Sequence, residues 1–251
     1  FGRSKSLERL GLLNVLPLGL RQMLAGILAQ SSSKVAIRKV AEVLGLPQID
    51  PYAAYPLSRQ SWPETTIAQL APGLEKMPNA VAAILEKIQA LPGFDAAPLL
   101  SKISTAEMST YMQNTLLRDS DQMSMAHALE VRVPFLDHEL VDLVMGISDA
   151  VKLPGAGPKP LLVAAMGEWL PDAIVNRPKM GFTLPYELWM KGALREFCAG
   201  HLAQLGERPF FAAAALQKLW QDFLRGHQGV KWSHLWSLVV LDEWLENNGL
   251  H

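Results

Sequence analysis

The sequence contains a single cysteine, Cys198, among 251 residues. One cysteine cannot form a disulfide within the chain, and it cannot supply a cysteine-based zinc site. Disulfides are typical of oxidising compartments and rare in the cytosol, so this composition fits a reducing environment. We therefore expect the protein to be cytoplasmic, with Cys198 as a small residue of the core.

An excess of charge of either sign is also lacking. The 23 lysines and arginines nearly balance 24 aspartates and glutamates, which leaves a formal net charge of −1. Proteins that bind nucleic acid usually carry a basic excess, so that class is not favoured. The longest apolar runs, such as residues 235–241, are interrupted by charge well before the roughly 20 residues that a bilayer span needs. We expect neither nucleic acid nor a membrane among the partners.

Strict alternation of apolar and polar residues, which is typical of half-buried strands, is nearly absent. The best strand candidate is Leu129–Val133, which is short and contains two charges. Apolar residues instead recur at helical spacing. The expected helices cover residues 35–44, 78–91, 138–147, 193–205, 213–224 and 232–245, and Asp137 is the expected N-cap of the helix at 138–147. A further helix is expected to begin after an N-cap at Thr105. The fold class is therefore predicted to be all-α, as a single helical domain over residues 1–251.

The last predicted helix, residues 232–245, is apolar on nearly all sides. A helix that is hydrophobic all round is normally buried. We expect either the rest of the chain or an interface to cover it.

The common short catalytic signatures are missing. The chain has no Gly-x-Ser-x-Gly turn, no His-Glu-x-x-His pair, no Walker loop and no Gly-x-Gly-x-x-Gly segment. Its six histidines include no pair at the spacing of metal ligands, so no metal site is predicted within the chain. Candidate catalytic or binding residues must therefore be sought in other sequence patterns.

One unusual segment is residues 116–137, where charged residues stand among apolar neighbours. The charged residues are Arg118, Asp119, Asp121, Glu130 and Arg132. A charge in apolar surroundings costs free energy unless it is paired. Pro134 holds the preceding residue extended, which fixes the direction in which Glu130 and Arg132 leave the backbone. Two interpretations stay open: a structural network of ion pairs, or part of a ligand site.

A second unusual segment is residues 176–185, in which two prolines and a glycine restrict a short loop that carries Arg177 and Lys179. Lysine acts as a mobile point charge and arginine as a planar fork, so such a loop can hold a cation against a phosphate. The alternative is a solvated basic turn.

Taken together, the two segments resemble the C-terminal part of the glutamine-dependent asparagine synthetase family. The run Asp-Gln-Met-Ser-Met-Ala-His at 121–127, followed by Leu-Glu-Val-Arg-Val-Pro-Phe-Leu-Asp at 129–137, is similar to one family motif. The run Asn-Arg-Pro-Lys-Met-Gly-Phe at 176–182, with Pro185 and Trp189 after it, is similar to a second. The resemblance is specific from about Leu116 to Trp189.

This family makes asparagine in two steps. ATP with Mg²⁺ activates the side-chain carboxylate of aspartate as an acyl-adenylate and releases pyrophosphate, and ammonia derived from glutamine then displaces AMP. The resemblance implies that Lys179 is catalytic, because its cation would hold pyrophosphate and stabilise the developing negative charge. The residues implied to line or brace the substrate and pyrophosphate site are Glu130, Arg132, Asp121 and Arg177. Gln122 stands where the family commonly has arginine, so the pairing made by that arginine is changed here.

Other family motifs are lacking from the chain. They are the N-terminal nucleophilic cysteine that hydrolyses glutamine, the pyrophosphate loop Ser-Gly-Gly-x-Asp-Ser and the acidic segment Gly-Glu-Gly-Gly-Asp-Glu. The resemblance thus implies the C-terminal helical part of an adenine-nucleotide alpha-hydrolase-like synthetase domain, whose parallel sheet and main ATP loop lie in a missing N-terminal half of the same protein. We expect the chain alone to be inactive, to expose apolar surface, and to form a homodimer or need another partner.

Three alternatives to asparagine formation stay open. Related enzymes use the same adenylating chemistry on another acceptor, to form a β-lactam, cyclise a peptide or amidate a polysaccharide sugar. The chain could instead be a helical interaction module without catalysis. It could also be a helical scaffold in which the charged segments serve only as structural pairs.

Overall fold

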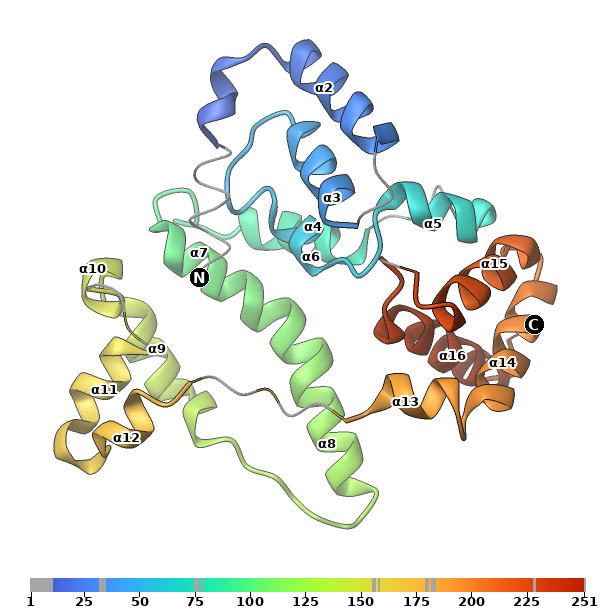
Figure 1. The fold of residues 1–251 in the computed structure, drawn as a ribbon. Coiled ribbons are helices and arrows are strands. Elements are labelled where there is room, and N and C mark those ends of the chain that lie inside the picture. Colours follow the sequence, from blue (N-terminus) through green and yellow to red (C-terminus); the bar gives the residue numbers. More distant parts are fainter. Residues whose placement is uncertain are drawn as a thin grey trace. The chain divides into compact units, whose positions relative to one another are not determined.

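The computed structural model describes residues 11–31, 35–74, 77, 79–154, 157, 159–178, 181, 184–227 and 229–250. In these ranges every regular element is a helix, which confirms the predicted all-α class (Figure 1). The strand expected at Leu129–Val133 was a wrong prediction, because the backbone there is extended but has no neighbouring strand to pair with. None of the described helices combines the length and apolar character that a membrane crossing requires.

Two compact units can be distinguished, residues 1–78 with 183–251 and residues 79–182. The helices of the first unit are η1 (Leu12–Val15), α2 (Leu18–Ser31), α3 (Val35–Leu44), α4 (Tyr55–Arg59), α5 (Glu64–Leu70), η2 (Pro72–Leu74), α13 (Tyr186–Lys191), α14 (Arg195–Glu207), α15 (Ala213–Leu224) and α16 (Trp232–Asn247). Among the predicted helices, α3 and α15 match residue for residue, and α14 and α16 match within two residues. The single domain over residues 1–251 stays a prediction.

A hydrophobic core lies among α14, α15 and α16. Its buried side chains include Leu202, Leu205, Leu216, Trp220, Phe223, Leu235 and Val239. Gly206 permits α14 to approach the start of α15, because a Cβ at this position would lie 3.0 Å from the Cα of Ala213. Cys198 is fully buried in the same core, and burial raises the pKa of its thiol. The expected role of Cys198 as a core residue is thereby confirmed.

Helix α16 is buried along one face, where Leu235, Leu238 and Val239 pack into the core. The side chains of Val240 and Trp244 are 49% and 54% exposed. The prediction that this helix is covered by the chain is therefore correct for one face only.

A buried arginine connects α2 to the end of α3. Arg21 donates through Nη2 to the carbonyl of Pro47 at 2.8 Å and through Nη1 to that of Leu46 at 2.9 Å. Nη1 also lies 3.5 Å from the carbonyl oxygen of Leu44, the last residue of α3. The final carbonyls of a helix have no partner inside it and attract positive charge. Arg21 therefore caps the C-terminus of α3 from a neighbouring helix.

The second unit is built on a continuous helical run of α7 (Leu99–Glu107), the π-helix η3 (Met108–Leu117) and α8 (Arg118–Met125), seen in green in Figure 1. The predicted N-cap at Thr105 is wrong, because this residue lies inside the run. Its hydroxyl donates to the carbonyl of Ser101, one turn earlier, at 3.0 Å. A threonine that bonds in this way is compatible with a helix interior.

The remaining helices of the second unit are α6 (Ala80–Gln89), η4 (Pro134–Leu136), α9 (His138–Gly146), α10 (Asp149–Lys152), α11 (Pro160–Met166), η5 (Gly167–Trp169) and α12 (Asp172–Val175). The predicted cap of α9 is confirmed, since Oδ1 of Asp137 accepts from the amides of Glu139 and Leu140 at 3.0 and 3.2 Å. Helix α6 confirms the helix expected at 78–91 and is capped by Asn79.

Among the described residues of the second unit, the buried side chains are confined to its first part. They are Leu85, Ile88, Phe94, Ser101, Ala106 and Thr110. Among the described residues from 111 to 178, none is buried. Large apolar side chains in this stretch are exposed, including Met123, Leu129, Phe135 and Leu143. The expectation of exposed apolar surface is confirmed, and the partner that would cover it stays a prediction.

We predict that Arg21→Ala lowers the free energy of unfolding by about 1.5–3 kcal/mol, because buried carbonyls would lose a charged donor. Chemical denaturation followed by circular dichroism measures this change. Gln22→Ala, at an exposed position of the same helix, is the matched control and should change stability by less than about 0.5 kcal/mol. Equal destabilisation by both variants would contradict the capping role.

Candidate functional site

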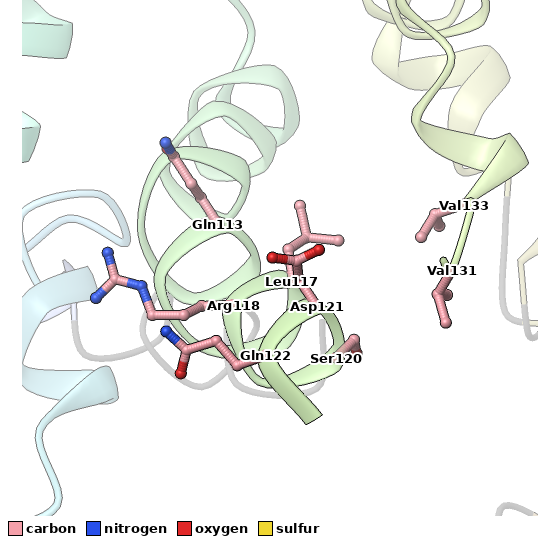
Figure 2. A pocket seen from close by; sticks show the side chains of 8 residues that line it. All are labelled: Gln113, Leu117, Arg118, Ser120, Asp121, Gln122, Val131 and Val133. Atoms are coloured by element: carbon pink, nitrogen blue, oxygen red, sulfur yellow. The ribbon is translucent and has the colours of Figure 1, made fainter. Parts of the chain in front are cut away.

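An open hollow lies between η3–α8 and the segment that follows α8. Its volume is about 530 Å³, and it is lined by Gln113, Leu117, Arg118, Ser120, Asp121, Gln122, Val131 and Val133. In Figure 2 the two valines face the helix from the following segment, whereas Arg118 and Gln122 extend from the other side of α8. The hollow thus combines an apolar wall with a helix that carries one carboxylate and one guanidinium.

The chain reverses after α8 at Ala128, which has a positive φ of 56°. The amide of Leu129 donates to the carbonyl of Ser124 at 3.0 Å, and that of Ala128 to the carbonyl of Met125 at 2.9 Å. This is the pattern of a helix end with a left-handed residue, a position that usually holds glycine. The turn sends residues 129–133 back in extended form, so Val131 and Val133 come to face the hollow.

Glu130 and Arg132 form an ion pair on this returning segment. Oε1 of Glu130 lies 3.0 Å from Nε and 2.9 Å from Nη2 of Arg132. The pair is one that the interpretation of segment 116–137 as a structural network expects. The two side chains are 70% and 85% exposed, so the pair is not buried. Two residues apart on an extended segment, they point to the same side.

Asp121 is the predicted site residue that lines the hollow. It is exposed on α8, and its backbone carbonyl accepts from the hydroxyl of Ser124 at 3.1 Å. Glu130 and Arg132 are not among the lining residues. In the described part of the chain, no hydrogen bond or ion pair joins Asp121 to either of them.

Of the two predicted cations in the loop at 176–185, Arg177 follows α12 and is exposed, and its amide donates to the carbonyl of Ile174 at 3.4 Å. Lys179 lies outside the described residues. The described residues show no ion pair between Arg177 and Asp121 or Glu130.

Sequence reasoning did not single out Gln113 and Ser120, which also line the hollow. A signal was present, because residues 113, 117 and 120 recur at the spacing of one helix face.

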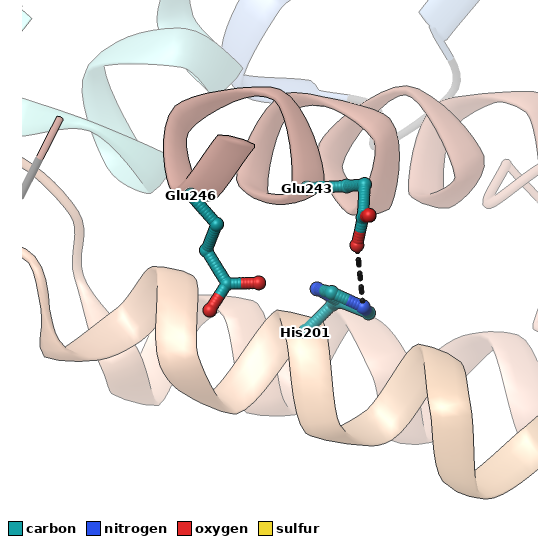
Figure 3. Close-up of side chains that lie close together, drawn as sticks. All are labelled: His201, Glu243 and Glu246. Atoms are coloured by element: carbon teal, nitrogen blue, oxygen red, sulfur yellow. Dashed lines mark ion pairs between the residues drawn. The ribbon is translucent and has the colours of Figure 1, made fainter. Parts of the chain in front are cut away.

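A second group of polar side chains lies in the first unit, where α14 meets α16. We name it the α14–α16 cluster: His201, Arg208, Asp242, Glu243 and Glu246. Nδ1 of His201 lies 3.0 Å from Oδ2 of Asp242, and its Nε2 lies 3.3 Å from Oε2 of Glu243 (Figure 3). Sequence reasoning missed this group because about 40 residues separate its two helices along the chain.

Comparison with known proteins bears on the function. The family model described as asparagine synthase matches residues 14–246. The chain belongs to this family. It is 35% identical over 98 residues to "Asparagine synthetase [glutamine-hydrolyzing] 1" of Bacillus subtilis (strain 168). The aligned segment covers 39% of the chain and 16% of that relative. It is 25% identical over 154 residues to "Putative asparagine synthetase [glutamine-hydrolyzing]" of Mycobacterium tuberculosis (strain ATCC 25618 / H37Rv), covering 58% and 22%.

A further relative is "Amidase chry2" of Gibberella zeae (strain ATCC MYA-4620 / CBS 123657 / FGSC 9075 / NRRL 31084 / PH-1), at 28% identity over 96 residues, or 36% of the chain and 14% of that relative. The matched segments thus span less than a quarter of the length of these three relatives. No solved structure matches the chain.

The hollow does not by itself make a magnesium site. Magnesium prefers octahedral oxygen ligands and is usually held by one or two carboxylates together with phosphate oxygens and water. Among the residues that line the hollow, Asp121 is the one carboxylate, and Arg118 lines the hollow although its guanidinium extends from the other side of α8 (Figure 2). The residues of the hollow fit the recognition of a polar ligand better than the binding of a lone cation.

We predict that Glu130→Ala changes the free energy of unfolding by less than about 0.5 kcal/mol, because an exposed ion pair contributes little. Thermal and urea unfolding of the variant measure this. Asp137→Ala is a useful comparison, since loss of the α9 cap should cost about 1 kcal/mol. A larger loss from Glu130→Ala than from Asp137→Ala would restore the interpretation of the Glu130–Arg132 pair as structural.

Proposed function

We propose that the chain is part of an ATP-dependent ligase that forms asparagine from aspartate with ammonia derived from glutamine. The observation that carries this proposal is the match of the asparagine synthase model to residues 14–246, which includes both unusual charged segments. The family supplies the reaction class, and the names of the bacterial relatives support the substrates. We place the protein in the cytoplasm, where ATP and these amino acids are found.

The proposed reaction has two bond exchanges. An oxygen of the aspartate side-chain carboxylate attacks the α-phosphorus of ATP, and the bond to pyrophosphate breaks. Ammonia then attacks the acyl carbon, the bond from that carbon to AMP breaks, and a proton is lost from nitrogen. Mg²⁺ bound together with ATP would neutralise phosphate charge. Its ligands would include groups beyond those that line the hollow.

We assign the catalytic role to Lys179. A fixed cation beside the leaving pyrophosphate stabilises negative charge that grows as the bond breaks, and one such group typically contributes about 2.7–4 kcal/mol. Asp121, Glu130, Arg132 and Arg177 are assigned to lining or bracing the site. The apolar wall of Val131 and Val133 supports this assignment, because it would limit the access of water to an acyl-adenylate.

A different acceptor is the second candidate. The similarity to a relative named as an amidase favours it, since that relative is not named for asparagine. The same adenylation can activate a carboxylate other than that of aspartate, and the acyl-adenylate is then captured by an amine that reaches the acyl carbon.

A partner surface is also part of the proposal. Met123, Leu129, Phe135 and Leu143 are all exposed, and exposed apolar side chains that gather on a surface are typical of an interaction site. We propose that the rest of the same protein, or a second copy in a homodimer, covers them, and that the chain alone is inactive. A purely non-catalytic interaction module would share this surface but would form no AMP.

The reaction is tested on the intact protein that the source gene encodes, supplied with aspartate, glutamine, ATP and MgCl₂. We expect asparagine, AMP and pyrophosphate in equal amounts by chromatography, and none without aspartate. AMP formation that needs another carboxylate would favour the second candidate. Absence of AMP and pyrophosphate with every carboxylate would contradict the ligase proposal.

For the same intact protein we predict that Lys179→Ala lowers kcat by about 10²–10³-fold, because transition-state charge loses its partner. Lys218→Ala is the control: that lysine is exposed and pairs with Asp222 on α15. The control should keep its turnover and its melting temperature. Unchanged turnover in Lys179→Ala would remove the catalytic role and favour the scaffold interpretation.

A further inference from the structure

The α14–α16 cluster is not used by the proposed function, and it has the arrangement of an oriented histidine. Asp242 is fully buried, its Oδ2 lies 3.0 Å from Nδ1 of His201, and its Oδ1 accepts from Nε of Arg208 at 3.0 Å. The buried carboxylate holds the imidazole ring through Nδ1, which leaves Nε2 as the nitrogen that faces Glu243, and Glu246 lies beside the same ring (Figure 3). A carboxylate behind the histidine is the usual outer support of a metal ligand.

The spacing of the other donors fits one ion. Nε2 of His201 lies 3.3 Å from Oε2 of Glu243, and two ligands about 2.0–2.1 Å from a tetrahedral ion are about 3.4 Å apart. The three donor atoms of His201, Glu243 and Glu246 lie within 4.8 Å of one another. The two glutamates are three residues apart on α16, so both face the same side of that helix.

We propose that His201, Glu243 and Glu246 bind a divalent transition-metal cation of the zinc class, which joins α14 to α16. An imidazole nitrogen with two carboxylates suits zinc better than magnesium or calcium, which prefer oxygen ligands throughout. Gln204 donates through Nε2 to Oε1 of Glu246 and so supports one ligand, as Asp242 supports His201. Three protein ligands leave a fourth position for water.

A metal-free explanation gives a different result. A protonated His201 bridging Asp242 and Glu243 would produce the same distances with no ion, and it predicts no tight zinc binding. The two explanations are separated by titration of the metal itself, which does not depend on the ligase reaction.

The test uses the full chain, freed of metal by a chelator and titrated with ZnCl₂ against a chromophoric zinc chelator. We expect one zinc per chain at this site, and binding at least about tenfold weaker in the double variant Glu243→Gln/Glu246→Gln. The double variant retains His201, Arg208 and Asp242, so its fold should be preserved, and circular dichroism checks this. His227→Gln is the matched control, because His227 pairs with Asp222 at an exposed position on the same unit.

Zinc should also raise the melting temperature of the natural chain and of His227→Gln, but not that of the double variant, because a ligand that binds only the folded state stabilises it. Equal zinc affinity in the natural chain and the double variant would overturn the proposal, since the ion would then bind elsewhere. Absence of zinc binding by the natural chain would overturn it as well.

Discussion

The carboxylate of Asp242 is fully buried, and a buried charge is tolerated only when other groups compensate it. His201 on α14 and Arg208, the residue that follows this helix, supply that compensation, each at 3.0 Å. The requirement fixes how far α16 is shifted along α14, because a displacement by one turn would leave the charge without partners. The apolar contacts of the core, such as Leu205 with the buried face of α16, are then made in one register. The same constraint brings Glu243 next to His201.

The two units differ in how far their own residues cover their apolar side chains. In the first unit the core among α14, α15 and α16 is closed, and Arg21 completes the end of α3. In the second unit buried side chains end at Thr110, and the described residues from there to 178 are half-buried or exposed. Apolar side chains in this later stretch contribute little to stability as they stand, since the hydrophobic effect acts on area removed from water.

Local sequence signals predicted most helices but not the surroundings of their side chains. Asp137, which caps α9, is a signal that acts within one turn, so the start of that helix followed from it. Thr105 misled the prediction because threonine can cap a helix or bond back inside one, and neighbours along the chain do not decide which. The segment 129–133 has β-branched residues, yet an extended segment becomes a strand only when a partner lies beside it.

The candidate site was predicted only in part, because sequence signals report contacts between residues that are close along the chain. For residues close in sequence, such as Glu130 and Arg132, an ion pair was one of two interpretations that the spacing allowed. Their exposure could not, because it depends on which elements pass over the segment. The α14–α16 cluster joins residues about 40 positions apart, and no period or motif reports such a contact. Sequence therefore located the family segments, whereas the structure was needed to show the hollow beside α8.

The exposure of the charged pair bears on why those charges are present. A structural network was one explanation of segment 116–137, and it requires that the charges be buried and stabilising. An exposed pair such as Glu130–Arg132 typically contributes at most about 1 kcal/mol, and Asp121 lines an open hollow instead of joining a described ion pair. A contribution to the stability of the chain therefore does not explain why charged residues stand at these positions. Contact with a ligand, or with a surface that covers the segment, accounts for them better, and that is the role that asparagine synthase chemistry would give them.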